Sequence, residues 1–192
     1  MLPDNNNQYV SRAAYKLESV ATVFKLDFKN KTVLDVGSST GGFSDYALQH
    51  GASRVIAVEK GTNQMDQFLR LNPKIELHEK TDIRAFKTSL LIDLALIDVS
   101  FVSLKDILPS VAKLVGPSGL IAAMAKPQFE TRDTAKKHKG VIKNEHMRRE
   151  LLKELELWMK QRFVIKAKAD SQISGVKGNL ERFYLLKVTK TA

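Results

Sequence analysis

Four charged residues of this sequence have the types and positions needed to deprotonate an alcohol. Asp98 closes the apolar run "LALI", Lys126 closes "IAAMA", and Glu181 precedes the last strand-like run. Lys16 lies at the border of the apolar face of a predicted helix near the N-terminus. Neighbouring cations and partial burial lower the pKa of a lysine, and carboxylates orient it. These four residues therefore predict a proton-transfer site.

A loop within "KTVLDVGSSTGGF", residues 31–43, predicts a small-molecule site. A strand-like run leads into a glycine-rich turn and then into a predicted helix. Such a turn presents backbone N–H groups and a helix N-terminus at the carboxyl edge of a sheet. The glycine spacing is neither that of a dinucleotide fingerprint nor that of a P-loop, so it favours S-adenosylmethionine over NAD. The candidate contacts are Asp35, Gly37, Ser39, Gly41, Gly42 and Phe43.

Acidic residues after the next strand-like runs extend this predicted cofactor site. Glu59 ends the second run, 22 residues after Gly37, where a carboxylate can bind ribose hydroxyls. Asp82 follows the third run, with Ile83 beside it, and could reach the adenine amino group. Asp98 is expected to contact the cofactor too. Singly, each residue is more often a turn or a solvated side chain, but their order on successive strand ends favours a site.

These residues are positioned by alternating strand-like and helical segments, which predict a parallel sheet. Strand-like runs cover 32–36, 54–58, 75–79, 93–99 and 119–125, and helical segments are predicted from Ser11 onward and at 44–50, 64–71 and 104–115. A long charged helix within 142–162 is followed by two strand-like runs, 163–171 and 182–190, with no helix between them. These two strands should be antiparallel. The predicted fold is α/β, with a mostly parallel seven-stranded sheet, an antiparallel last strand and helices on both faces.

Composition limits the organisation of the chain. Its 192 residues, 43 % of them hydrophobic, suffice for one core, so one domain is predicted over 9–192 after a loose tail at 1–8. The absence of cysteine excludes disulfides, thiolate nucleophiles and cysteine zinc sites. The four histidines lack ligand spacing, so no metal is predicted. Neither a signal sequence nor a membrane-spanning run is found in the sequence, and a cytoplasmic protein is expected.

The charge of the chain predicts a polyanionic partner. The net charge is +10, and residues 126–168 hold 13 Lys and Arg against 6 Asp and Glu, or +7 of that total. Clustered cations bind nucleic acid by displacing counterions from phosphates. From charge alone, a solvated helix face beside a loop is an equally good interpretation.

Five segments together resemble the TlyA-type (haemolysin A) family, whose catalytic domain is similar to FtsJ-like ribosomal RNA 2′-O-methyltransferases. In order they are "YVSRAAYKLE", "VLDVGSSTGGFSDYALQHGA", "LIDVSFVSL", "AKPQFE" and "GNLERF". The resemblance starts at Tyr9, and the S4-like RNA-binding domain that such proteins usually carry has no counterpart in these residues. It implies that the α/β fold is a Rossmann-like S-adenosylmethionine-dependent methyltransferase fold. It also implies a catalytic tetrad of Lys16, Asp98, Lys126 and Glu181, S-adenosylmethionine as cofactor, and a cytidine 2′-hydroxyl of ribosomal RNA as acceptor.

The resemblance also directs the basic segment towards RNA, either naked ribosomal RNA or ribosomal subunits, with a separate targeting protein as a further possible partner. The predicted phosphate contacts are Lys136, Lys137, Lys139, Arg148 and Arg149, and the predicted nucleobase contacts are Tyr9, Phe101 and Phe129. Two alternatives stay open. One is a non-catalytic RNA- or ribosome-binding factor that retains the cofactor pocket, and the other is a membrane-active haemolysin, against which the lack of a spanning segment argues.

Overall fold

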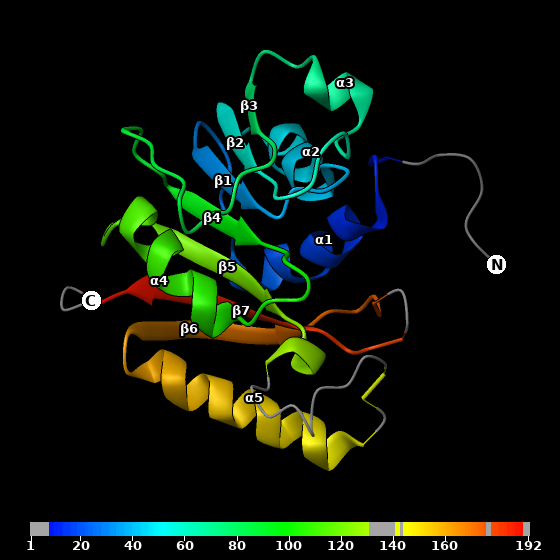
Figure 1. Cartoon of the computed structure of the whole chain (residues 1–192), viewed down its shortest axis with the longest axis vertical. Coiled ribbons are helices and arrows are strands. Elements are labelled where there is room, and N and C mark those ends of the chain that lie inside the picture. Colours follow the sequence, from blue (N-terminus) through cyan, green and yellow to red (C-terminus); the bar gives the residue numbers. More distant parts are fainter. Residues whose placement is uncertain (1–7, 131–140, 143, 176–177, 190–192) are drawn as a thin grey trace.

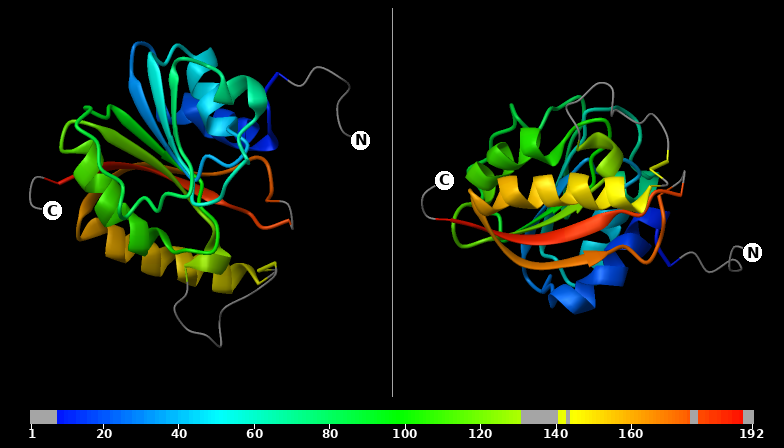
Figure 2. Two further views of the ribbon diagram at one scale, coloured as in Figure 1. Left: turned by 45° about the horizontal axis from the view of Figure 1, so that its top comes forward. Right: turned by 90° about the horizontal axis from the view of Figure 1, so that it is seen from below.

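The chain folds around one seven-stranded sheet with helices on both faces (Figures 1 and 2). The computed structural model describes residues 8–130, 141–142, 144–175 and 178–189. The strand order is β3-β2-β1-β4-β5-β7-β6. The strands are β1 Thr32–Val36, β2 Arg54–Val58, β3 Ile75–His78, β4 Leu94–Ile97, β5 Leu120–Ala125, β6 Phe163–Asp170 and β7 Arg182–Val188.

Strand directions bring the predicted chemistry to one edge of the sheet. Strands β1 to β5 are parallel, whereas β7 is antiparallel to both β5 and β6. Because Ala125 at the end of β5 pairs with Arg182 at the start of β7, the residues before β7 lie beside the residues after β5. The predicted fold class and the antiparallel final pair are confirmed.

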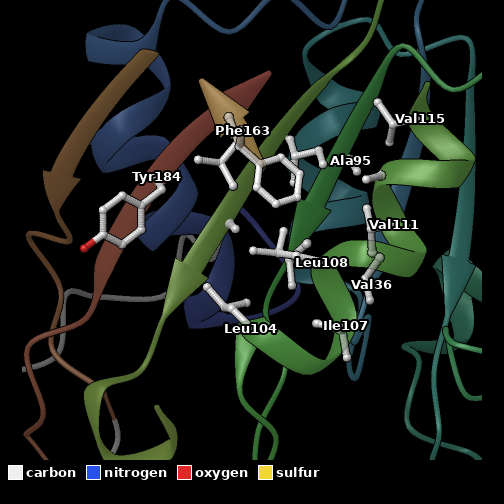
Figure 3. Packing of buried hydrophobic residues seen from close by; sticks show 14 of the residues in the cluster. Val36, Ala95, Leu104, Ile107, Leu108, Val111, Val115, Phe163 and Tyr184 are labelled. Atoms are coloured by element: carbon white, nitrogen blue, oxygen red, sulfur yellow. The ribbon is translucent and has the colours of Figure 1, made fainter. Parts of the chain in front are cut away.

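Two apolar layers form because alternate strand residues point to opposite faces of the sheet. On one face, Val33 and its equivalents pack against α1 (Arg12–Phe24) and α2 (Gly42–Gln49). On the other, Leu34 and its equivalents pack against α4 (Leu104–Val115) and α5 (Glu145–Lys160). Figure 3 shows the second layer, where α4 presents apolar side chains along one face to Val36, Ala95 and Tyr184. The sheet is therefore covered on both sides, and its carboxyl edge is available for a site.

Two helices begin at other residues than predicted, and one short helix was not predicted at all. The helix predicted over 64–71 is a single turn, α3 (Gln67–Arg70), because the Asp66 side chain accepts a hydrogen bond from Phe68 N and starts the helix there. Helix α2 begins at Gly42, two residues before the prediction. A short 3-10 helix, η1 (Pro127–Phe129), follows β5 and was not predicted.

Candidate active site

An ion pair joins the ends of the two central strands β4 and β5. Lys126 Nζ lies 2.6 Å from Asp98 Oδ1 and donates to Ser100 Oγ at 2.9 Å. The two charged side chains are only 11 % and 17 % exposed. Asp98 N still donates to Val36 O, so β4 is held against β1 up to the residue that carries the carboxylate. The pair therefore sits on rigid strand ends rather than on a long loop.

A second ion pair joins α1 to the start of β7. Lys16 Nζ donates to Glu181 Oε2 at 2.6 Å, and the pair is almost fully buried, with side chains 11 % and 4 % exposed. Glu181 is fastened further by its backbone, because Ser171 N donates to Glu181 O. The structure thus places all four predicted tetrad residues at the carboxyl edge of the sheet, where they form two ion pairs.

Two adjoining pockets lie at this edge. The larger has a volume of about 640 Å³, and the smaller has a volume of about 300 Å³ and is lined by Lys16, Asp35 and Lys126 among others. Both pockets are lined by Gly37, Ser39, Asp98 and Ser100. A ligand could therefore extend from the larger pocket towards the two lysines.

Gly37 is the glycine that lets the chain turn between these pockets. Its φ is +82°, and a Cβ atom there would lie 2.6 Å from the backbone oxygen of Asp98. An L side chain would be strained by the left-handed backbone and would push the glycine loop away from β4.

We expect Gly37→Ala to weaken S-adenosylmethionine binding about tenfold or more, the effect of roughly 1–2 kcal/mol of left-handed strain at the pocket wall. Titration calorimetry measures it, with circular dichroism to verify folding. Gly116→Ala is the matched control, because Gly116 also has a positive φ, of +68°, but lies at the end of α4 with nothing within 4 Å of its Cβ position. An unchanged affinity for Gly37→Ala would mean that this glycine serves only the turn.

Gly41 and Gly42 lie where two helices pack closely behind the loop. Gly41 has a φ of +96°, and a Cβ there would lie 2.5 Å from Leu69 Cδ1 in α3. A Cβ on Gly42 would overlap Ser11 Oγ, at the start of α1. In the structure both glycines permit close helix packing behind the loop, and neither lines the two pockets. Their contact with a cofactor stays a prediction.

Asp35 is a fully buried carboxylate whose surroundings suit a cationic ligand. Ser44 Oγ donates to Asp35 Oδ2 at 2.6 Å, but Oδ1 has no hydrogen-bond partner among the described residues. Burial raises the pKa of Asp35 to about 7, and the nearby carboxylates of Asp98 and Glu59 add to the effect. The neighbouring Ser38 Oγ is likewise buried without a partner. Among the described residues, no lysine or arginine forms an ion pair with Asp35. Unpaired polar atoms beside the pocket therefore fit the positively charged end of S-adenosylmethionine.

A cation bound near Asp35 should make cofactor affinity depend on pH. Because the carboxyl group is protonated below its pKa of about 7 in the free protein and must ionise to face a cation, affinity should rise with pH. We expect S-adenosylmethionine to bind about tenfold more weakly at pH 6 than at pH 8. Titrations of Asp35→Asn isolate this carboxyl from the titration of the ligand itself, and an equally steep profile in that variant would exclude Asp35 as the cause.

The other predicted cofactor residues line the larger pocket, with partners that the sequence did not reveal. Glu59 accepts hydrogen bonds from Ser39 N at 2.9 Å and Gly61 N at 2.6 Å. Asp82 accepts two hydrogen bonds from the Arg84 guanidinium, at 2.9 and 2.6 Å, and one from Arg84 N at 3.0 Å, and together they hold the pKa of the carboxyl well below its usual range. Adenine would have to compete with that guanidinium for Asp82. Ile83 and Ser39 line the same pocket, and Phe43 lines the smaller one.

Three serines at the site were missed by the sequence reasoning. Ser44 bonds Asp35, Ser100 accepts from Lys126, and Ser38 lies buried beside the smaller pocket. Ser38 and Ser100 each follow a strand end by two or three residues, which is the one signal that could have indicated them. Ser44 could not be identified, because its partner lies nine residues away and meets it only when α2 packs on β1.

Two of the predicted RNA contacts are wrong. Arg148 is 4 % exposed, because it pairs with Asp170 at 2.7 Å and donates to Leu180 O, so it cannot reach phosphates. Tyr9 is 3 % exposed and donates to Glu18, so it cannot stack on a base. Arg149 is exposed and pairs weakly with Glu145 at 3.3 Å. Lys136, Lys137 and Lys139 lie outside the described residues.

Phe101 and Phe129 form an aromatic pair next to the site. Their ring centroids are 5.1 Å apart with an interplanar angle of 44°. Phe101 is 90 % exposed and lines the larger pocket, whereas Phe129 is half-buried. An exposed phenylalanine at a pocket rim presents a free ring face to solvent, which is the form of a stacking surface.

Within the described residues, no group of three potential metal ligands occurs, and no helix is long and apolar enough to span a bilayer. His50 Nδ1 lies 2.8 Å from Tyr46 O, and His78 Nε2 lies 2.8 Å from Glu76 Oε1. Both histidines therefore have local protein partners.

Comparison with known proteins connects this site to a family. The profile of the FtsJ-like methyltransferase family matches residues 9–188. The chain is 39 % identical over 178 residues to the 23S rRNA (cytidine-2′-O)-methyltransferase TlyA of Campylobacter jejuni, covering 92 % of this chain and 70 % of that protein. It is 37 % identical to YqxC of Bacillus subtilis, a proposed rRNA methyltransferase, covering 92 % of this chain and 65 % of that protein's length.

Solved structures agree with the sequence comparisons. A proposed hemolysin from Streptococcus thermophilus superposes with a TM-score of 0.90 at 35 % identity, over 98 % of this chain and 70 % of that one. The N-methyltransferase NodS of Bradyrhizobium japonicum, solved with S-adenosyl-L-homocysteine, superposes with a TM-score of 0.65 at 12 % identity, over 98 % of this chain and 94 % of that one, and shares the fold alone. With a family profile covering nearly every described residue and relatives above 35 % identity, this chain belongs to the FtsJ-like methyltransferase family.

Proposed function

We propose that this chain transfers a methyl group from S-adenosylmethionine to the 2′-hydroxyl of a ribose in ribosomal RNA, with cytidine as the modified nucleoside. The observation that carries the proposal is the Lys126–Asp98 ion pair in the wall of a pocket that adjoins a larger cleft. Membership of the family supports the reaction type. The choice of cytidine is supported by the names of two relatives, the TlyA proteins of Campylobacter jejuni and Mycobacterium tuberculosis.

The tetrad residues would divide the work of preparing the hydroxyl. When bound, S-adenosylmethionine supplies an electrophilic methyl group on a cationic sulfur. Lys126 would accept or orient the proton of the attacking hydroxyl, and Asp98 would hold its amine in place. Lys16, fixed by Glu181, would present a second cation to the same oxygen. The site stands on strand ends and a packed helix, which keeps the reacting groups in register.

The pocket residues would hold the cofactor in an extended form. Asp35 and the loop at Gly37 would face its cationic end. Glu59, directly after β2, would accept hydrogen bonds from ribose hydroxyls in place of one of those that it now accepts from Ser39 N and Gly61 N. Asp82 and Ile83 would border the adenine. These assignments agree with the direction in which the larger pocket runs from β1 towards β3.

On the substrate side, Phe101 is the proposed nucleobase contact, with Phe129 supporting its ring from behind. Stacking of a base on an aromatic side chain contributes about 1–3 kcal/mol and does not depend strongly on base identity. Phe101 would therefore hold the target nucleotide at the rim of the cleft, while the lysines act on its ribose.

Methylation of purified ribosomal subunits and of naked ribosomal RNA with labelled S-adenosylmethionine tests the proposed function. We expect label in RNA at a single ribose, located by mapping of 2′-O-methyl groups. Label on a base, or no label with any of these substrates in spite of cofactor binding, would contradict it.

The excess of seven positive charges over residues 126–168 predicts that this segment binds phosphates. We expect neutralising Lys136, Lys137 and Lys139 together to weaken RNA binding across unrelated sequences and to lower the salt slope by about 0.7 to 0.9 for each lost contact. Fluorescence titrations at several salt concentrations measure both. Neutralising Lys25, Lys29 and Lys31 is the charge-matched control, because these residues lie between α1 and the start of β1, away from the carboxyl edge that holds the two pockets. Equal effects of the two triple variants would mean that only net charge matters.

A further inference from the structure

The loops after β4 and β5 are joined to each other by a buried carboxylate that the proposed chemistry does not use. Glu130, directly after η1, is 2 % exposed. Its Oε2 accepts from Ser103 Oγ at 2.7 Å, and its Oε1 accepts from Leu104 N at 3.2 Å. Ser103 and Leu104 start α4, at the far end of the loop that begins with Asp98. The carboxylate therefore fixes the end of that loop to the end of the Lys126 loop.

The two loops meet at three successive places. At their starts, Lys126 contacts Asp98 and Ser100. In the middle, the ring of Phe129 lies against that of Phe101. At their ends, Glu130 binds the first residues of α4. The segment that carries Phe101 is thus held on both sides, by a lysine before it and by a carboxylate after it.

Phe101 needs such support, because its backbone is in the left-handed region. Its φ is +66°, a conformation that is strained for a bulky residue and persists only when the surroundings impose it. The side chain itself supplies little, since it is 90 % exposed. The contacts at Ser100 and Ser103 therefore have to impose the turn that projects the ring outward.

Capping of α4 alone does not account for Glu130. The hydroxyl of Ser103 already accepts from Lys105 N and caps the helix. Burying a carboxylate has a cost, visible in the pKa of Glu130, which burial raises to about 7. Ser103 satisfies one N–H group at the helix start and Glu130 satisfies a second, but an N–H group at a helix start does not need a buried carboxylate from another loop. The link between the two loops is therefore the feature to explain.

We propose that Glu130 is a positioning residue, which holds the Phe101 turn of the Asp98 loop against the Lys126 loop and so sets where the target nucleotide sits. The proposal rests on the proposed function, since it gives Glu130 a role through Phe101. It assigns to Glu130 no contact with substrate or cofactor.

Hydrogen exchange followed by mass spectrometry tests the positioning without any reaction. In Glu130→Ala, peptides covering 98–105 should exchange about tenfold faster, the change that corresponds to loss of one buried hydrogen bond. In Glu130→Gln they should stay within about threefold of wild type, because the amide can still accept from Leu104 N and contact Ser103. Val111→Ala is the stability control: it removes buried methyl groups from the same helix without touching either loop. If Glu130→Ala is poorly folded, Ser103→Ala removes one of the two hydrogen bonds of the link from the other side, together with the cap on Lys105 N, and should accelerate exchange of the same peptides.

Single-turnover methyl transfer to RNA separates positioning from stability. We expect Glu130→Ala to slow it about tenfold to a hundredfold, with cofactor affinity unchanged and with rescue by Glu130→Gln. In a Phe101→Ala background the same change should have a much smaller effect, because Glu130 acts through that residue.

The results distinguish this proposal from the proposed function. A wild-type protein that methylates no RNA overturns the proposed function, while the exchange experiment still decides about Glu130. If the wild type is active, any of three results overturns the positioning role alone. They are unaltered hydrogen exchange in Glu130→Ala, a loss of methyl transfer equal to that of Val111→Ala, and additive effects of Glu130→Ala and Phe101→Ala.

Discussion

Lys126→Ala is expected to lose methyl transfer by about a hundredfold or more while binding S-adenosylmethionine within a few-fold of wild type. A hundredfold loss of rate is typical when a positioned proton-transfer group is removed. The variant also leaves the Asp98 carboxylate without its ammonium and Ser100 without a donor. Single-turnover transfer measures the chemistry, and calorimetry measures the affinity. A variant that reacts at nearly the wild-type rate would remove Lys126 from the mechanism.

A matched control for this variant is Lys105→Ala. Lys105 in α4 forms an ion pair with Glu154 at 2.7 Å and has a side chain 10 % exposed, close to the 2.6 Å and 11 % of Lys126. It lines neither pocket, so its removal should leave methyl transfer intact. Lys126→Arg adds a finer distinction, because arginine keeps the charge but cannot act as a base at neutral pH. Activity of the arginine variant would show that the cation orients the hydroxyl without taking its proton.

Much of the fold could be predicted because apolar runs and glycine turns are local signals. Strands β1 and β2 and helix α4 begin and end at the predicted residues, since each is a continuous or periodic apolar segment. The prediction of α3 was too long, because the position of the Asp66 cap, rather than the apolar pattern, decides where that turn starts. Local signals therefore located the elements better than their ends.

The site could be predicted only as far as strand ends determine it. Asp98, Lys126 and Glu181 were found together because parallel and antiparallel strands bring their ends to one edge. Which lysine pairs with which carboxylate depends on side-chain packing between α1 and β7, and no sequence signal reports it. The same holds for Arg148. In the sequence it cannot be distinguished from a solvated arginine of an amphipathic helix, because its partner Asp170 is brought to it only when β6 packs against α5.

The Lys16–Glu181 pair offers the sharpest separation of structure from chemistry. Lys16→Ala would leave a carboxylate that is 4 % exposed without its cation, which costs about 3–5 kcal/mol in the free energy of unfolding. Lys16→Met combined with Glu181→Met replaces the pair by apolar side chains of similar volume, a change that is often neutral or stabilising. We therefore expect the single variant to be unstable and the double variant to regain stability in urea unfolding.

Methyl transfer should not follow stability in these variants. If Lys16 presents a cation to the attacking hydroxyl, the double variant will be folded, will bind S-adenosylmethionine and will still transfer methyl groups at least a hundredfold more slowly than wild type. A stable double variant with wild-type transfer would mean that the pair only fastens α1 to β7. A buried ion pair does not by itself stabilise a fold more than apolar side chains of the same volume. If the Lys16–Glu181 pair can be replaced with folding kept and activity lost, the reaction is the reason for the pair.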